Sequence, residues 1–301
     1  MYQALIDVLS PLLASEQKDA RRLFHGRGHL FEGLEHINID WYPPMLLITA
    51  YDEIENITDL VTDIQTLDQQ SQIQSVLLQE RYKKGVPATQ MAGNPIQACE
   101  VTEGPLRFEV HPGSQQNAGL FLDMRPLRQW LQANSHDLNV LNLFAYTCSL
   151  SVAALAGKAR QVVNVDMSKT SIKWGEKNHL LNNQDLRSVK SIPHNLFRSW
   201  GRIKQFGRYD LIIIDPPSRQ RGSFNVEKDY RTILKRLGKL CNKNAMIIAS
   251  VNSPYLGMDF LTAQFSRFAP TATFLREMPP SPEFADKYPE RGLKVGLFRM
   301  G

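Results

Sequence analysis

The chain has 301 residues and a formal net charge of +5 at pH 7, from 35 Lys and Arg against 30 Asp and Glu. Its content of 43% hydrophobic, 22% charged and 9% aromatic residues is ordinary for a globular protein and excludes a disordered, collagen-like or coiled-coil chain. The length is sufficient for one large domain or two smaller ones.

The positive charge is unevenly distributed. Residues 1–100 carry 7 Lys and Arg against 14 Asp and Glu, whereas residues 101–301 carry 28 against 16. Residues 187–243 hold 14 basic and four acidic side chains. Such a cluster indicates either an anionic partner, of which nucleic acid is the commonest, or a solvated basic face without a partner. Charge alone leaves both interpretations open.

Residues 1–100 predict a small α+β domain. Apolar residues at helical spacing over about 1–15, with no basic segment before them, predict an amphipathic helix and not a signal peptide. The elements expected after it are a basic turn at 21–28, strands at 37–42 and 45–50, a helix at 57–70 and a strand at 73–78. The glycines and prolines of 83–95 predict a loop, and we place the domain boundary at about residue 100.

Residues 101–301 predict a second domain in which strands and helices alternate. The expected elements are extended segments at 101–110 and 119–122, strands at 140–144, 161–165, 189–192, 211–214 and 245–249, and helices at 126–134, 149–156, 169–181 and 226–241. Short apolar strands such as 211–214 are typical of a parallel sheet that is buried on both faces. The pattern therefore predicts a doubly wound, mostly parallel α/β sheet.

The chain offers little sign of a membrane span or a metal centre. The uncharged stretch 138–157 is interrupted by polar residues, which favours a strand, a loop and a helix over a membrane span. The three cysteines, Cys99, Cys148 and Cys241, lack the spacing of a zinc site or a disulfide framework. We expect no metal, no membrane partner and a cytoplasmic location. The oligomeric state is left open.

Candidate ligand residues follow the predicted strands, because a doubly wound sheet binds its ligand at the carboxyl ends of the strands. Asp166 ends one strand, where a carboxylate accepts hydrogen bonds from both hydroxyls of a ribose. The absence of glycine between Leu141 and Ala156 disfavours the pyrophosphate of a dinucleotide, which leaves S-adenosyl-L-methionine. A strand-end Asp is also a common helix N-cap.

The segment Asp215-Pro216-Pro217 follows the wholly apolar strand. Two prolines fix the backbone and remove two N–H donors, which leaves rigid carbonyl groups for a cleft. The alternative is a simple strand-terminating turn.

These segments together resemble the class I S-adenosylmethionine-dependent methyltransferases that modify large-subunit ribosomal RNA, the group of the 5-methylcytosine and 7-methylguanine 23S enzymes. The matching segments are 117–125, 142–149, 165–168, 215–217 and 229–230. Residues 21–54 resemble the small domain that precedes the catalytic domain of this family. Two departures are Cys148-Ser149 in place of Gly-Gly and Asn195 in place of an acidic residue.

The resemblance implies a Rossmann-like fold, S-adenosyl-L-methionine as cofactor and 23S rRNA as partner. The cofactor-binding residues that it implies are Phe121, Asp123, Arg125, Phe144, Tyr146, Thr147, Asp166, Met167, Ser168, Asn195, Leu196 and Asp215. The catalytic residues that it implies are Asp215, Pro216, Pro217 and Asn252.

The type of methyl transfer follows from one position. Methylation of cytosine C5 requires a cysteine that adds covalently to the base. By the resemblance, the 5-methylcytosine members have this cysteine in a Ser-Cys-Ser stretch at the position where this chain has Val251. The spacing of Ser250-Val251-Asn252 and Met258-Asp259 instead resembles the 7-methylguanine member. Guanine N7 carries a free lone pair, so its methylation needs only in-line positioning of an unstacked base. Tyr255 and Phe224 are candidate stacking partners, or they are packing residues.

The basic cluster then predicts contacts with RNA phosphates. The expected RNA-binding residues are Arg219, Arg221, Lys228, Arg231 and Lys235. Two other functions remain open: an RNA-binding protein with a methyltransferase fold that has lost cofactor binding, and a methyltransferase of proteins or small molecules.

Overall fold

The computed structural model describes residues 2–220 and 224–301, which form two compact units. One unit comprises Met1–Arg125 with Ser281–Tyr288, and the other comprises Pro126–Pro280 with Pro289–Gly301. The hairpin of β6 (Cys99–Glu103) and β7 (Leu106–Val110) belongs to the first unit, where Thr102 bridges Asp19. The first unit thus extends to Arg125, past the domain boundary that we expected near residue 100. The separate roles of the two domains remain predictions.

The first unit is built on a five-stranded sheet in the order β1-β2-β3-β4-β5. Its strands are β1 (Arg21–His25), β2 (Ile37–Tyr42), β3 (Met45–Ala50), β4 (Ser75–Glu80) and β5 (Ala88–Gly93). Neighbouring strands are antiparallel except β3 and β4, which are parallel because α2 (Ile57–Leu67) connects them. The predicted turn at 21–28 is therefore partly a strand, and the predicted loop at 83–95 contains the edge strand β5.

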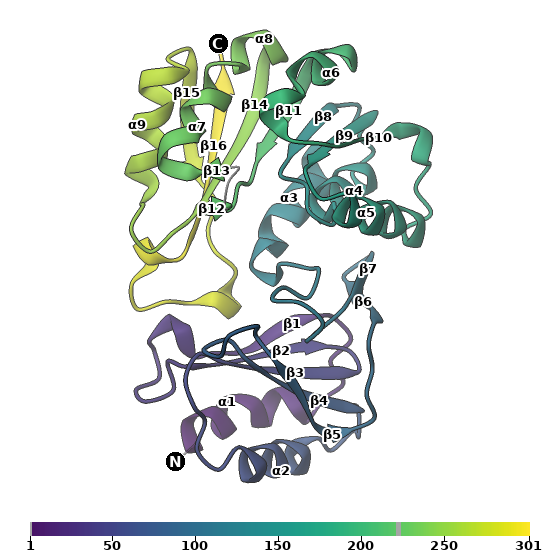
Figure 1. Cartoon of the computed structure of the whole chain (residues 1–301), viewed down its shortest axis with the longest axis vertical. Coiled ribbons are helices and arrows are strands. Elements are labelled where there is room, and N and C mark those ends of the chain that lie inside the picture. The colour runs from purple at the N-terminus through teal and green to yellow at the C-terminus, as the bar shows by residue number, and fades with distance from the viewer. Residues whose placement is uncertain (1, 221–223) are drawn as a thin grey trace. The chain divides into compact units, whose positions relative to one another are not determined.

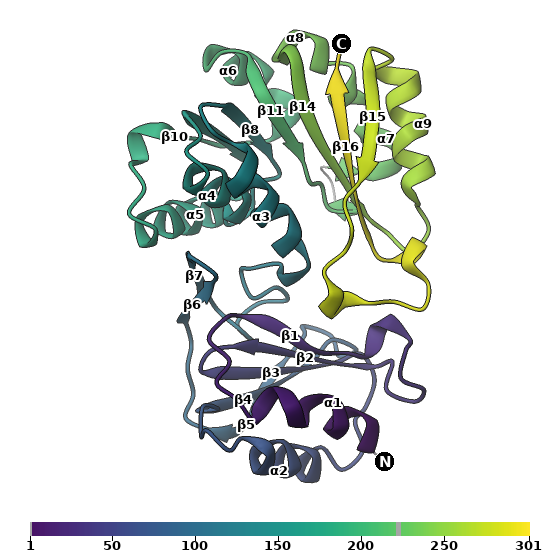
Figure 2. The ribbon, with the colours of Figure 1, turned by 180° about the vertical axis from the view of Figure 1, so that it is seen from behind.

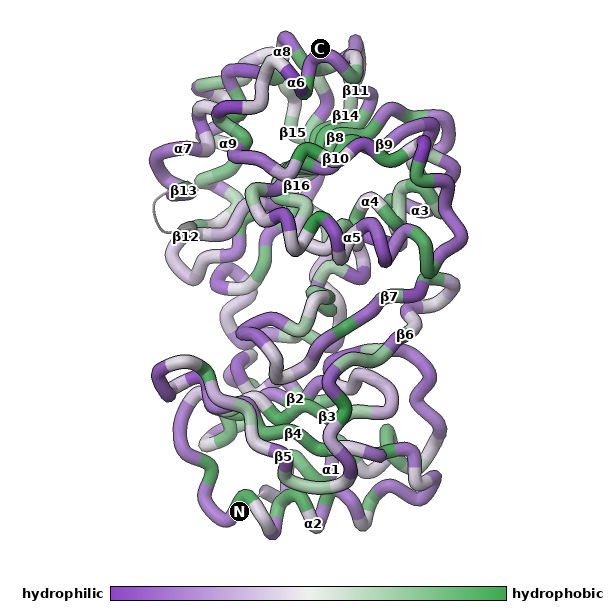
Figure 3. The backbone as a smooth tube through the Cα atoms, turned by 45° about the vertical axis from the view of Figure 1, so that its right-hand side comes forward, coloured by the Kyte–Doolittle hydropathy of each residue, from purple (hydrophilic) through white to green (hydrophobic). Residues whose placement is uncertain are grey.

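Two helices cover one face of this sheet (Figures 1 and 2). Leu5, Leu9 and Leu13 recur at helical spacing in α1 (Gln3–Leu13) and are fully buried. They pack in one core with Ile37 and Ile39 of β2 and with apolar residues of α2. Figure 3 shows the hydrophobic residues of this sheet concentrated along β2, β3 and β4. These contacts explain why the first predicted helix forms.

The second unit contains a seven-stranded sheet in the order β10-β9-β8-β11-β14-β16-β15. Its strands are β8 (Asn139–Leu143), β9 (Gln161–Asp166), β10 (Val189–Pro193), β11 (Tyr209–Ile214), β14 (Cys241–Asn252), β15 (Ala272–Glu277) and β16 (Leu293–Met300). The five strands from β10 to β14 are parallel, and β16 is antiparallel to both of its neighbours. The chain order reverses between β8 and β11, which is the switch point of a doubly wound sheet. The predicted fold class is confirmed.

Helices flank the sheet and bury its parallel strands from both sides. They are α3 (Arg125–Asn134), α4 (Ser149–Ala156), α5 (Lys169–Leu181), α6 (Trp200–Gln205), α7 (Val226–Leu234), α8 (Leu237–Leu240) and α9 (Met258–Phe268). Side chains of α6, α7 and α9 share one core with alternate residues of the strands. Helices α4 and α5 contact β8, β9 and β10 (Figure 1). Right-handed crossovers on the two sides of a switch point place their helices on opposite faces.

Three predicted elements of residues 101–301 also differ from the structure. The segment 101–110 is a hairpin that turns at Gly104, and 119–122 is not a strand but leads into a 3-10 helix at Leu122–Met124. The helix predicted at 226–241 ends earlier, since Cys241 already pairs with Tyr209 of β11. The stretch 138–157 forms β8 and α4, as predicted. In the described part of the chain, no helix combines the length and apolar character that crossing a membrane requires.

Candidate active site

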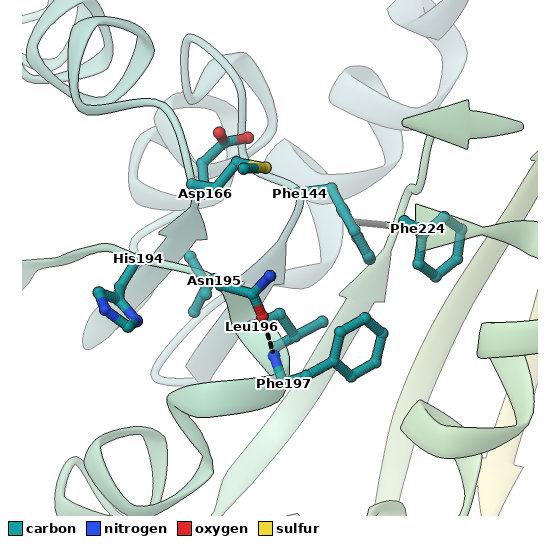
Figure 4. A pocket seen from close by; sticks show the side chains of 9 residues that line it. Phe144, Asp166, His194, Asn195, Leu196, Phe197 and Phe224 are labelled. Carbon is teal, nitrogen blue, oxygen red and sulfur yellow. Dashed lines mark hydrogen bonds between the residues drawn. The ribbon is translucent and has the colours of Figure 1, made fainter. Parts of the chain in front are cut away.

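A pocket opens at the carboxyl ends of β8, β9 and β10 in the second unit (Figure 4). It has about 330 Å³ of open space, including solvent at its mouth. The residues that line it are Phe144, Val165, Asp166, Met167, His194, Asn195, Leu196, Phe197 and Phe224. Five of these (Phe144, Asp166, Met167, Asn195 and Leu196) are predicted cofactor-binding residues, so the structure brings this part of the predicted site together.

The carboxylate of Asp166 links the loops that follow β8 and β9. One oxygen accepts a hydrogen bond from the backbone N–H of Tyr146 at 2.9 Å, and the other accepts from the backbone N–H of Ser168 at 2.8 Å. Burial raises the pKa of Asp166, and these two donors oppose the increase. Each carboxylate oxygen has a second lone pair, so both can still accept from a ligand hydroxyl. Ser168, and not Asp166, is the N-cap of α5.

The loop after β8 holds its backbone in an unusual conformation. Phe144, Tyr146 and Cys148 have φ of 60°, 48° and 63°, in the left-handed region that residues with a Cβ rarely adopt. Thr147 is buried, and its carbonyl oxygen accepts from the side chain of Asn178 at 3.0 Å. Of the predicted cofactor residues of this loop, Phe144 lines the pocket, whereas Tyr146 and Thr147 do not.

Asn195 directs its amide nitrogen toward the pocket (Figure 4). Its side-chain oxygen accepts from the backbone N–H of Phe197 at 2.9 Å and so caps the 3-10 helix Leu196–Arg198. A backbone N–H needs an acceptor, which fixes the amide orientation and leaves the NH₂ group for a ligand. The amide therefore offers hydrogen-bond donors at this position, where an acidic residue would offer acceptors only.

Three aromatic side chains form one wall of the pocket (Figure 4). Phe144 contacts Phe224 edge-on at 4.9 Å between ring centroids, and Phe224 stacks with Phe197 at 6.3 Å. Phe224 is buried, so of its two predicted roles the structure shows packing. Phe197 and His194 are lining residues that were not among the predicted site residues; His194 directly follows β10, and Phe197 lies in the 3-10 helix Leu196–Arg198. Tyr255 is 90% exposed.

The predicted catalytic residues lie at the switch point. Leu143 of β8 pairs with Ile214 of β11, so Phe144 and Asp215 leave neighbouring strands at the same edge of the sheet. The hydroxyl of Ser250 on β14 donates to the carboxylate of Asp215. Burial and the charge of Asp215 raise the pKa of Tyr230, whose hydroxyl donates to the carbonyl of Ser250 at 3.2 Å.

The loop after β11 also meets the end of β14. The hydroxyl of Ser218 donates to the carbonyl oxygen of Asn252, the exposed last residue of β14. Side chains two residues apart on a strand share a face, so Asn252 projects to the same side as Ser250, the partner of Asp215. Pro216 is buried and Pro217 is exposed between them. The structure thus gathers Asp215, the two prolines and Asn252.

Three predicted cofactor residues lie in the first unit. Phe121 is 40% exposed, and Asp123 and Arg125 are half-buried. Arg125 pairs with buried Glu103 at 3.5 Å and donates to the carbonyl of Ala20. These contacts give Arg125 a structural role in its own unit. Binding of the cofactor by these three residues stays a prediction.

Four of the five expected RNA-binding residues lie in the described part of the chain and are exposed: Arg219, Lys228, Arg231 and Lys235. Arg219 lies on a hairpin of β12 (Arg219–Gln220) and β13 (Phe224–Asn225), and Arg221 lies outside the described residues. Lys228, Arg231 and Lys235 are spaced so that they share one face of α7 and the residue after it. Helix α7 runs from the pocket edge of the sheet toward the opposite edge. Of these four exposed residues, Arg219 and Lys228 are therefore the two that lie nearest the switch point.

No thiol is available at this edge of the sheet. Cys148 is buried, and burial raises its pKa well above the usual range. Burial also raises the pKa of Cys99 and of Cys241 to about 12, and Cys241 begins β14 at the edge opposite the pocket. Within residues 2–220 and 224–301, no group of three or more His, Cys, Asp or Glu is arranged to hold a metal ion.

Solved structures resemble the whole chain. A protein described as a methyltransferase and crystallised with S-adenosylhomocysteine (SAH) has a TM-score of 0.85 and 25% identity, over 99% of this chain and 80% of that chain. An S-adenosylmethionine-dependent methyltransferase from Streptococcus mutans has a TM-score of 0.84 and 24% identity, over 99% and 81%. The second of these likenesses shows the fold alone.

Curated relatives match part of their length. "Ribosomal RNA large subunit methyltransferase K/L" of Vibrio cholerae is 31% identical over 239 residues, which are 74% of this chain and 33% of the relative. The protein of the same name from Hahella chejuensis is 30% identical over 72% of this chain. The chain spans about a third of the length of these relatives. The family model of S-adenosylmethionine-dependent methyltransferases matches residues 21–299, and the chain belongs to that family.

Proposed function

We propose that S-adenosyl-L-methionine binds in the pocket at the ends of β8, β9 and β10. The side chains fit a nucleoside: the Asp166 carboxylate accepts from the two ribose hydroxyls, the Asn195 amide donates to a ring nitrogen of adenine, and Leu196 and Phe197 cover apolar surface. The bound cofactor supplies a methyl group on a positively charged sulfur. Phe144 lines the pocket and leaves the strand next to that of Asp215. The proposed catalytic residues therefore lie beside the Phe144 end of the cofactor pocket.

We infer that the substrate is RNA, and specifically a base of large-subunit ribosomal RNA. The names of the Vibrio cholerae and Hahella chejuensis relatives support this substrate. The exposed cations Arg219, Lys228, Arg231 and Lys235 support it independently, because they follow the Asp215 loop and phosphate contacts of this kind supply affinity and register. A ribosomal substrate implies that the protein acts in the cytoplasm.

The proposed chemistry is direct in-line transfer without a covalent intermediate. A cysteine nucleophile reacts as the thiolate, and all three thiols of this chain have a raised pKa. Cys148 is buried in the loop after β8, and Cys241 lies at the edge of the sheet opposite the pocket. Asp215 and Asn252 hold the base by its polar edge, and the rigid Pro216-Pro217 backbone limits its orientations. We infer that guanine N7 is the acceptor, because it carries a lone pair and no proton and because the spacing of Asn252 and Met258-Asp259 resembles that of the 7-methylguanine member.

One observation supports this function most strongly: the Asp215–Ser250 hydrogen bond lies at the switch point beside the nucleoside pocket, where the thiol of Cys148 is buried. The test is transfer of labelled methyl from S-adenosyl-L-methionine to purified large-subunit RNA and, in parallel, to total protein. We expect label in the RNA. Label in protein or in small molecules would contradict the substrate, and no transfer together with tight RNA binding would favour a binding protein.

A further inference from the structure

Helix α5 approaches the loop after β8 at a position without a side chain. Gly175 is buried in the middle of α5, and a Cβ added there would lie 2.3 Å from Sγ and 2.7 Å from Cβ of Cys148. Ordinary van der Waals contacts begin at about 3.4 Å. The Cys148 side chain therefore occupies the space that any larger residue at position 175 would need.

The same face of α5 also holds the loop by hydrogen bonds. The Asn178 side chain donates to the carbonyl oxygen of Thr147 at 3.0 Å. The Ser151 hydroxyl lies 3.0 Å from both the Cys148 carbonyl oxygen and Nε2 of His179. Positions 175, 178 and 179 share one face of the helix, because they are three and four residues apart. Asn178, His179 and Ser151 are all fully buried.

This loop needs such support. Its three left-handed residues, Phe144, Tyr146 and Cys148, are not glycines, so the backbone conformation must be held by surrounding contacts. The conformation places the Tyr146 N–H on Asp166 and the Phe144 ring in the pocket wall. A shift of the loop would therefore move two components of the pocket together.

We propose that Gly175 and Asn178 are positioning residues for cofactor binding. Helix α5 holds the loop after β8 in its conformation, because the absence of a side chain at position 175 leaves the space that the Cys148 side chain fills. The inference rests on the cofactor site proposed above. Neither residue lines the pocket, so both act through the loop.

The experiment measures SAH binding to the full chain by calorimetry for wild type, Gly175→Ala, and Gly175→Ala combined with Cys148→Gly. We expect Gly175→Ala to weaken binding about 10- to 100-fold, since a displacement of about 1 Å in a binding constellation has effects of this size. Cys148→Gly removes the two closest atoms and suits the positive φ. The carbonyl carbon of Thr147 then lies 3.2 Å from the new Cβ, which a shift of a few tenths of an ångström relieves, so the double variant should return to within about threefold of wild type.

Gly201→Ala is the matched control, because nothing lies within 4 Å of a Cβ added at this position of α6. It should bind SAH as wild type does. If Gly175→Ala does not fold, a double variant that folds and binds still supports the inference, since the rescue locates the clash at Cys148. Unchanged binding by Gly175→Ala, or a double variant without recovery, overturns the inference. A wild-type chain that does not bind SAH overturns the cofactor site, and the inference with it.

Discussion

Replacement of Asp166 by Asn tests the proposed cofactor site with the smallest change of shape. The wild-type carboxylate accepts from the backbone N–H of Tyr146 at 2.9 Å and of Ser168 at 2.8 Å, through different oxygens. An amide has one acceptor oxygen, so its NH₂ group must face one of these two donors. The variant therefore loses one hydrogen bond within the protein and one acceptor toward the ribose.

The two losses have different magnitudes. A hydrogen bond to a charged acceptor contributes about 1.5–3 kcal/mol. Within the protein, part of this is offset, because burial already disfavours the charged form and raises the pKa of Asp166. We expect the free energy of unfolding to fall by about 1–2 kcal/mol. Cofactor binding has no such offset, so the Kd for SAH should rise about 10- to 150-fold.

Isothermal titration calorimetry with SAH measures the Kd, and denaturant unfolding measures the stability. Asp185→Asn is the matched control, since Asp185 is an exposed carboxylate that caps a short 3-10 helix by accepting from Arg187, and Asn caps equally well. Its Kd should equal that of wild type. An Asp166→Asn variant that binds SAH with wild-type affinity would refute the assignment of the ribose to this carboxylate.

Four further predictions concern catalysis, RNA binding and stability. Asp215→Ala should lower methyl transfer to RNA at least about 100-fold while circular dichroism shows an intact fold; wild-type turnover would contradict its role. A variant with all three cysteines changed to alanine should stay within about tenfold of wild-type activity, because no covalent thiol is required; a folded but inactive variant would restore the covalent mechanism. Lys228→Ala combined with Arg231→Ala should weaken RNA binding at every sequence and reduce the slope of log Kd against log salt by about 1.4; an unchanged slope would exclude these phosphate contacts. Burial lowers the pKa of His179 to about 4, so the unfolded state binds more protons than the folded state below about pH 6.5. The free energy of unfolding therefore falls as the solution is acidified, and His179→Gln should make this fall smaller in denaturant titrations at pH 7 and 5. An equally steep fall in the variant would contradict the role of His179.

The buried sheet of the second unit could be predicted because its strands have a strong local signal. The run at 211–214 is wholly apolar, and the structure places it in β11, the central strand of the seven-stranded sheet. Asp166 could be found for a similar reason, since it ends a buried strand. By contrast, β1 is a strand only because it pairs with β2, and β14 begins at Cys241 only because it pairs with Tyr209. Such pairing is tertiary and leaves no local pattern.

The remaining pocket residues lie where sequence patterns carry little information. His194 directly follows β10, and Phe197 lies in a short 3-10 helix. Phe224 enters the wall because β13 pairs with β12, which follows the Asp215 loop. The amide orientation of Asn195 depends on one backbone N–H that the 3-10 helix leaves unpaired. Gly175 resembles any helix glycine until its neighbour Cys148 is known. These features depend on three-dimensional contacts.

The identity of the methylated nucleoside tests the central claim most directly. Large-subunit RNA is incubated with the protein and S-adenosyl-L-methionine, digested to nucleosides and analysed by mass spectrometry, with the Asp215→Ala variant in parallel. In-line transfer to guanine N7 beside Asp215, without a covalent thiol intermediate, predicts 7-methylguanosine with the wild-type chain and none with the variant. Formation of 5-methylcytidine, or of equal 7-methylguanosine with both proteins, would contradict the account.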